Sequence, residues 1–147
     1  MYRRTASGLE VFLVHPGGPY WAKKSGGAWG IPKGEYNKDE TALAAAKREF
    51  TEETGFTAAG PFVELGSIEQ KSGKIVTAWA VEGDCDPADL LSNTCSLEWP
   101  PKSGKFVEIP EIDQGRWFGM TEARETIRKA QEPLLRRLQD ALARSKR

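Results

Sequence analysis

Residues 34–56 read GEYNKDETALAAAKREFTEETGF, and the rest of the chain is best interpreted outward from this stretch. Its centre is rich in alanine, lysine, arginine and glutamate, which favour helix. Asn37 is a suitable N-cap, and Glu40 three residues later completes a capping box. Gly55 is suited to the left-handed position that ends a helix. The pattern predicts a helix from Asn37 to Thr54.

One face of this helix is expected to be buried. At about 100° per residue, five side chains share a face: Leu43, Ala46, Lys47, Phe50 and Thr54. We expect Leu43 and Phe50 to anchor this stripe and Lys47 to lie at its margin.

Three carboxylates lie beside that stripe. Glu52 and Glu53 lie three and four residues after Glu49, so the three carboxylates occupy adjacent sectors of the helix. Like charges at this spacing cost about 0.2–0.5 kcal/mol per pair, which a divalent cation would offset. Hard oxygen ligands favour Mg²⁺, with Mn²⁺ as a substitute. The alternative is a solvated charged face with Lys47 and Arg48 as counter-charges.

A zinc cluster of cysteine and histidine is excluded for this chain by itself. Cys85 and Cys95 are its two cysteines, and His15 is its single histidine, far away in sequence. We expect both cysteines to be free thiols, as in a reducing compartment.

The spacing of the whole stretch resembles the Nudix box. Gly34 is followed after five residues by Glu40, and after seven more by the run Arg48-Glu49-Phe50-Thr51-Glu52-Glu53-Thr54-Gly55-Phe56. A looser likeness extends to Trp29-Gly30-Ile31-Pro32-Lys33 before the box and Arg116-Trp117-Phe118 after it.

This resemblance implies a fold and a site. The fold would be α/β, a Nudix fold in which an α/β/α sandwich is built on a mixed β-sheet. Carried over by position, Glu49 and Glu53 would be metal ligands, with Glu52 as a further ligand, direct or through water. The Gly34 carbonyl would complete the set. Arg48 would orient Glu49, while Glu40 and Gly55 would support the structure of the box.

The implied reaction is magnesium-dependent hydrolysis of a pyrophosphate linkage in a nucleotide. A glutamate must also take a proton from the attacking water. Within the catalytic group of Arg48, Glu49, Glu52 and Glu111, both Glu49 and Glu111 are candidates for the base. Glu111 belongs to the loop Pro110-Glu111-Ile112-Asp113 ahead of the late tryptophan.

The substrate is expected to be a small nucleotide. Lys33 is a candidate phosphate contact, and Tyr20, Trp29 and Trp99 are candidates for stacking on a base. Similarity to dinucleoside polyphosphate hydrolases and to bacterial predicted NTP pyrophosphohydrolases suggests a dinucleoside polyphosphate or an NTP. The alternatives are a diphosphoinositol polyphosphate hydrolase, or a Nudix module that senses a nucleotide without cleaving it.

Outside the box, the pattern of apolar residues predicts further strands and helices. No comparably clear strand is expected before Leu9–Val14. The expected strands are Leu9–Val14, Phe62–Ile68, Lys74–Val81, Phe106–Ile109 and Arg116–Phe118, with the second and third forming a hairpin. Thr121 is expected to cap a helix through about Ala130, and Pro133 suits the first turn of another.

Composition limits the other possibilities. The 147 residues suit one domain, 1–147, and 39% hydrophobic residues are enough for a folded core. The 21 basic residues balance the 21 acidic ones, so no nucleic-acid polymer is expected as a partner. Neither a signal peptide nor a membrane segment is recognised, which predicts a cytoplasmic protein; the oligomeric state, monomer or homodimer, stays open.

Overall fold

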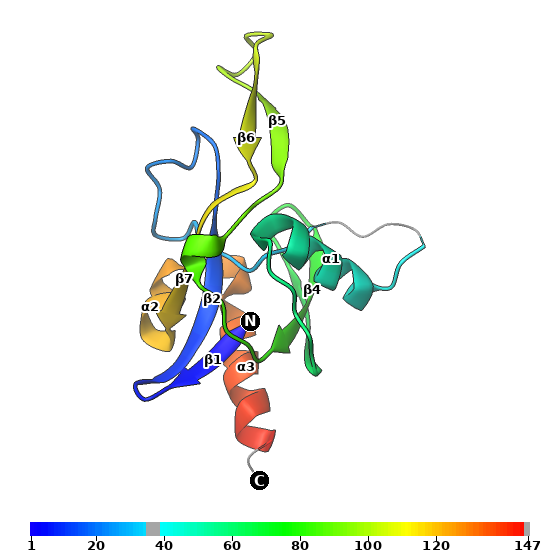
Figure 1. Ribbon diagram of the computed structural model, residues 1–147, viewed down its shortest axis with the longest axis vertical. Helices are drawn as coiled ribbons and strands as arrows, with labels where there is room; N and C mark the ends of the chain where they lie inside the picture. The colour runs from blue at the N-terminus through cyan, green and yellow to red at the C-terminus, as the bar shows by residue number, and fades with distance from the viewer. Residues whose placement is uncertain (35–38, 146–147) are drawn as a thin grey trace.

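The computed structural model describes residues 1–34 and 39–145 and contains seven strands and three α-helices within them (Figure 1). The central sheet is antiparallel in the order β1-β2-β7. The strands are β1 (Tyr2–Thr5), β2 (Gly8–Pro16), β3 (Phe62–Glu69), β4 (Ile75–Val81), β5 (Thr94–Glu98), β6 (Phe106–Pro110) and β7 (Ile112–Gly119). The helices are α1 (Ala42–Thr54), α2 (Met120–Thr126) and α3 (Glu132–Ser145).

Two hairpins accompany this sheet. β3 pairs with β4, and a parallel bridge from Tyr2 to Glu82 ties the end of that hairpin to the central sheet. β5 pairs with β6 in a second hairpin, which extends away from the rest of the fold (Figure 1). Antiparallel pairs and parallel bridges therefore occur together, which agrees with the expected α/β class.

β2 is buried on both faces, because successive residues of a strand point to opposite sides. Val11 and Leu13 pack in the core cluster that contains Ala123 of α2 and Leu138 of α3. Phe12 and Val14 face the other way, and the Phe12 ring lies 6.0 Å from that of Phe56, just after α1. The sheet thus lies between α1 on one side and α2 and α3 on the other. In the part of the chain that the structure describes, no helix is both long and apolar enough to cross a bilayer.

α1 begins later than expected. Thr41 is the N-cap, and its Oγ1 accepts a hydrogen bond from the Ala44 N–H at 3.1 Å. Asn37, the expected cap, lies outside the described residues. Gly55 ends the helix as predicted, with φ of 80° and its N–H bonded to the Thr51 carbonyl at 2.8 Å.

The buried face of α1 differs from the expected stripe. The buried residues are Ala45, Phe50, Glu53 and Thr54, whereas Leu43 and Ala46 are only half-buried and Lys47 is exposed. The helix is therefore rotated so that a carboxylate, Glu53, enters the interior.

The other expected elements are confirmed except at three places. β1 and β5 were not expected, since YRRT and TCSLE are short and mostly polar. The helix expected from Thr121 to Ala130 instead starts at Met120, with Gly119 as its N-cap, and ends at Thr126. It ends there because Ile127 becomes extended and forms a parallel bridge with Trp29. Pro133 lies in the first turn of α3, as expected.

Packing of α3 onto the sheet is expected to stabilise the fold strongly. Leu138 is 5% exposed, so Leu138→Ala should lower the free energy of unfolding by about 2–5 kcal/mol through lost burial and a residual cavity. Urea denaturation measures this. The matched control is Leu91→Ala, because Leu91 is 75% exposed, and its effect should stay within about 0.5 kcal/mol. Equal effects of the two changes would contradict this account of the core.

Candidate active site

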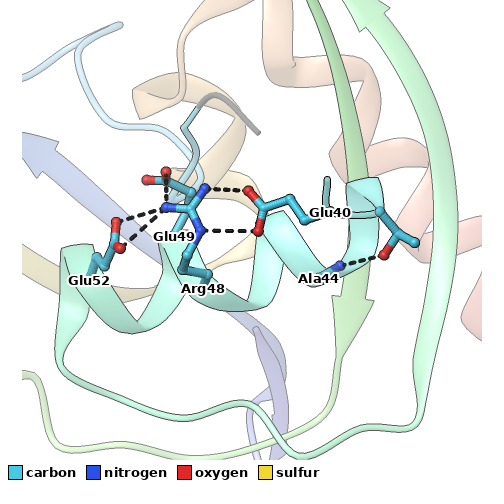
Figure 2. A network of polar contacts seen from close by, with 6 residues as sticks. Glu40, Ala44, Arg48, Glu49 and Glu52 are labelled. Atoms are coloured by element: carbon cyan, nitrogen blue, oxygen red, sulfur yellow. Dashed lines mark hydrogen bonds and ion pairs between the residues drawn. The ribbon is translucent and has the colours of Figure 1, made fainter. Parts of the chain in front are cut away.

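Arg48 joins three of the box glutamates on the surface of α1 (Figure 2). Its Nη2 lies 2.6 Å and its Nε 3.2 Å from the two carboxylate oxygens of Glu40. Its Nη1 donates to Glu49 at 2.8 Å and to Glu52 at 3.1 Å. These hydrogen bonds, above all those to Glu40, raise the pKa of Arg48. The network fixes the orientation of all three carboxylates; the supporting role of Glu40 stays a prediction.

Glu53 follows Glu49 by about one turn of α1, and its side chain is buried. It is 7% exposed, and its Oε2 accepts the backbone N–H of Lys33 at 2.9 Å. Burial raises the pKa of Glu53 from 4.5 to about 7, and the negative charges of Glu111 and Glu49 act in the same direction. The Lys33 N–H opposes this shift only in part. Glu53 is thus a carboxylate held close to other carboxylates with little positive charge to balance it.

Gly34 brings the backbone of the preceding loop against Glu49. A Cβ on residue 34 would lie 2.1 Å from the carboxyl carbon of Glu49, so any larger residue here would force the Glu49 side chain to move. The loop backbone, Glu49 and Glu53 therefore lie together at one end of the site.

Glu111 is held in the same region by backbone hydrogen bonds between residues that are far apart in sequence. The Asn93 N–H bonds to the Glu52 carbonyl at 2.8 Å, and the Glu111 N–H bonds to the Asn93 carbonyl at 2.9 Å. The Gly17 N–H in turn bonds to the Glu111 carbonyl at 2.9 Å. Burial, together with the charges of Glu49 and Glu52, raises the pKa of Glu111. Two separate segments thus supply acidic side chains to one place.

The donor set fits a hard divalent cation. It consists of carboxylate and backbone oxygens, and the pKa of Glu53 is raised first by burial and then by the charges of Glu111 and Glu49, which a bound cation would offset. Within residues 1–34 and 39–145, however, no group of three or more acidic, cysteine or histidine side chains is arranged to hold a metal. Arg48 instead pairs with Glu49 and Glu52. The residue types suit the ion, although the side chains do not form a closed set of ligands.

The predicted substrate residues are only partly brought together. Lys33 is half-buried beside Glu53, and it borders a cavity of about 540 Å³ that is also lined by Gly34, Lys74 and apolar side chains of α1 and β4. That volume is in the range of small-molecule sites. Tyr20 is 57% exposed, in the loop of residues 17–28, with the Lys24 ammonium 3.6 Å from its ring centre.

The other two aromatic candidates lie elsewhere. Trp29 is 4% exposed, and its ring packs between His15 and Phe118 at centroid distances of 5.2 and 5.0 Å. This burial argues against base stacking by Trp29, because core side chains cover the ring. Trp99 lies in the turn of the β5–β6 hairpin, whose tip points away from α1 (Figure 1). Stacking by Trp99 stays a prediction.

Sequence reasoning missed Arg128, whose charge acts on Lys33, and its aromatic neighbour Trp21. Arg128 is among the charges that shift the pKa of Lys33, and its guanidinium carbon lies 5.1 Å from the ring centre of Trp21. Residue 128 fell inside an expected helix, so nothing in the local pattern set it apart.

Glu53 should make the metal-free protein less stable as the pH rises. Its folded pKa of about 7 exceeds the ordinary 4.5, so between these values the folded state holds one proton more than the unfolded state. That stability is complete below pH 4.5 and is lost as the pH rises through 7, on the order of 3 kcal/mol. We expect Glu53→Gln to reduce this loss when urea denaturation is followed in EDTA.

The control for this measurement is Glu125→Gln, which changes an exposed glutamate of α2. It should keep the wild-type dependence on pH. A wild-type slope in Glu53→Gln would show that Glu53 ionises normally in the folded chain.

Comparison with known proteins agrees with this geometry. Residues 3–138 match the family model of the NUDIX domain. An uncharacterized 17.7 kDa protein of Enterobacteria phage T4 is 35% identical over 88 residues, which are 58% of this chain and 57% of the phage protein. The match thus spans little more than half the length of that relative.

Solved structures share the fold at low sequence identity. An Ap4A hydrolase of C. elegans, solved as a binary complex, superposes with a TM-score of 0.68 at 21% identity, over 97% of this chain and 93% of that one. The NUDIX domain of NrtR from Shewanella oneidensis, in complex with ADP ribose, gives 0.66 at 13% identity over 96% and 82%. A MutT protein from Methanosarcina mazei gives 0.58 at 22% identity over 95% and 89%. With the family model matched over most of its length, the chain belongs to the Nudix family.

Proposed function

We propose that this chain is a divalent-cation-dependent hydrolase that cleaves a pyrophosphate linkage in a nucleotide. The observation that carries the proposal is the convergence of Glu49, Glu53 and Glu111 beside Lys33. Membership of the Nudix family supports the same reaction class. The acidic side chains suit a divalent cation, and the lysine suits the phosphates of a substrate that binds together with that cation.

The cation would be Mg²⁺, for which Mn²⁺ can substitute. Four residues would hold it: Glu49, Glu53, Gly34 through its carbonyl, and Glu52 directly or through water. When bound, such an ion neutralises phosphate oxygens that otherwise repel an incoming nucleophile. Arg48 acts on this set as a positioning residue, because its contacts with Glu40, Glu49 and Glu52 fix their orientation. Gly55 ends α1 two residues after Glu53.

A carboxylate must take a proton from the attacking water as its oxygen bonds to phosphorus and the bridging P–O bond breaks. Glu49 and Glu111 are the two candidates. Glu49 is ion-paired with Arg48, whereas Glu111 forms no ion pair within the described part of the chain. We favour Glu111 as the base, since an unpaired carboxylate accepts a proton more readily, and Glu49 as a ligand.

The proposed substrate is an NTP or a dinucleoside polyphosphate. The C. elegans structure is named as an Ap4A hydrolase, and the Shewanella domain was solved with ADP ribose, so nucleotides with linked phosphates bind this fold. The cavity beside Lys33 is large enough for a nucleoside. A diphosphoinositol polyphosphate is less well supported, because among the described residues Lys23, Lys24 and Lys71 form no ion pair with the carboxylates of the site.

A module that binds a nucleotide without cleaving it is the second candidate. The specific observation in its favour is that the described side chains form no group of three that could hold a metal. The complete set of Glu49, Glu52, Glu53 and Arg48 favours the enzyme, because binding alone does not need these carboxylates.

The test is turnover of a substrate panel in Mg²⁺ with the products identified. The panel contains nucleoside triphosphates, dinucleoside polyphosphates, sugar nucleotides and diphosphoinositols. Glu53→Gln should lower kcat/KM for the best substrate at least about a hundredfold, because it removes a buried anionic ligand. Glu111→Gln should lower kcat with KM nearly unchanged if Glu111 is the base.

Glu125→Gln is again the control and should behave as the wild type. Binding of nucleotides without turnover of any of them would favour the sensing module. Near-normal rates in Glu53→Gln would contradict the proposed enzyme.

A further inference from the structure

The start of β7 carries one residue more than the strand it pairs with. His15 of β2 lies opposite Gln114. The next residue, Pro16, lies opposite Ile112, so Asp113 has no partner in the ladder. Such a β-bulge interrupts regular pairing and changes the direction of nearby side chains. The ladder between β2 and β7 is thus interrupted two residues after the favoured base.

The ring of His15 holds the side chain of this extra residue. Its Nδ1 lies 2.8 Å from Oδ1 of Asp113. The histidine is buried, with 6% of its surface exposed, and its ring packs on Trp29 at a centroid distance of 5.2 Å. Because core contacts fix the ring, the contact with Asp113 fixes the side chain of the bulge.

The second ring nitrogen of His15 contacts a different segment. Nε2 lies within hydrogen-bond distance of the Lys24 carbonyl oxygen, in the loop of residues 17–28. A carbonyl and an ionised carboxylate both accept, so the ring makes both hydrogen bonds when each of its nitrogens carries a proton. One buried side chain therefore joins the bulge of β7 to the loop that contains Tyr20.

The position of the Glu111 carboxylate depends on its backbone. Among the described residues, that carboxylate has neither a hydrogen-bond partner nor an ion-pair partner. Its backbone is held between Asn93 and Gly17, which bond to its N–H and its carbonyl. The N–H of Ile112, the next residue, bonds to Oγ of Ser92 at 3.0 Å. The side chain therefore follows any shift of this segment.

The bulge lies at the other end of the same segment. Asp113 comes two residues after Glu111, so its contact with His15 holds the chain just beyond the base. Catalysis is sensitive to such positions, because a displacement of about 1 Å can lower a rate about a hundredfold. Loss of the contact is thus expected to act on kcat rather than on substrate binding.

We propose that His15 is a positioning residue for the reaction. Through Asp113 it fixes the bulge that presents Glu111 to the site, and through the Lys24 carbonyl it ties loop 17–28 to β2. The kinetic effect of this role rests on the proposed function, because Glu111 is the base favoured there. The hydrogen bonds themselves can be tested without turnover.

Two substitutions separate the two ring nitrogens. In His15→Gln, the side-chain amide can reach the Lys24 carbonyl but not Asp113. In His15→Asn, the shorter amide can reach Asp113 but not the Lys24 carbonyl. His15→Gln should lower kcat about tenfold or more with KM within about twofold, whereas kcat of His15→Asn should stay within about threefold of the wild type. A larger loss of kcat in His15→Asn than in His15→Gln overturns the proposal.

Substitutions of Asp113 test the same contact from its other side. Asp113→Ala removes the acceptor and should lower kcat as His15→Gln does. Asp113→Asn keeps an oxygen that accepts the Nδ1–H and should restore most of kcat. The matched control is Asp140→Ala, which changes an exposed aspartate of α3 and should behave as the wild type. A normal kcat in Asp113→Ala contradicts the role of His15.

A double-mutant cycle distinguishes positioning of the base from a merely structural role. If His15 acts through Glu111, His15→Gln should lower kcat no further when Glu111→Gln is already present. A structural role would lower kcat by the same factor in both backgrounds, and that result overturns the proposal.

Amide hydrogen exchange tests the hydrogen bonds independently of turnover. In His15→Gln, the N–H groups of Glu111 and Ile112 should exchange about tenfold faster or more, while those of the β3–β4 hairpin keep wild-type rates. Unchanged exchange at these two amides, or equal acceleration throughout the chain, overturns the proposal. If the wild type cleaves no nucleotide, or Glu111→Gln cleaves normally, the proposed function fails, and exchange alone decides whether His15 fixes the segment.

Discussion

The carboxylate of Glu53 is buried where α1 meets the Lys33–Gly34 loop, and the rest of the site is arranged around it. An ionised carboxylate in such surroundings is costly unless positive charge lies beside it. The Lys33 N–H supplies only part of that charge, and Glu49 and Glu111 add repulsion. The fold therefore keeps a position that favours either a proton or a cation.

The charges around this position are divided between two sides. Glu49, Glu52, Glu53 and Glu111 gather at the end of α1, while Lys33 lies on the side of the preceding loop. Arg48 pairs with half-buried Glu49 and exposed Glu52 and does not pair with buried Glu53 among the described contacts. A molecule that carries linked phosphates and a divalent ion complements both sides, which connects the fold with the proposed chemistry.

Features that depend on a few neighbouring residues could be predicted from the sequence. Gly55 ends α1 and the hairpin of β3 and β4 forms, because turn and helix signals lie within a few residues. The rotation that buries Glu53 depends on packing against the sheet, which periodicity does not reveal. Glu111 is connected to the box by backbone bonds through Asn93, and Trp29 enters the core because β2 and β7 pack against it. The sequence pattern did not single out Arg128, because the end of α2 at Thr126 depends on the bridge between Ile127 and the distant Trp29.

The central claim is that Glu49 and Glu53 hold a divalent cation. Anomalous scattering from crystals grown with Mn²⁺ at a pH above 7 tests it directly, because the signal locates the ion independently of activity. The account predicts a peak about 2.0–2.3 Å from carboxylate oxygens of both residues, a typical length for oxygen ligands of such ions. A fully occupied Mn²⁺ elsewhere on the chain, with both carboxylates turned away from it, would contradict the account.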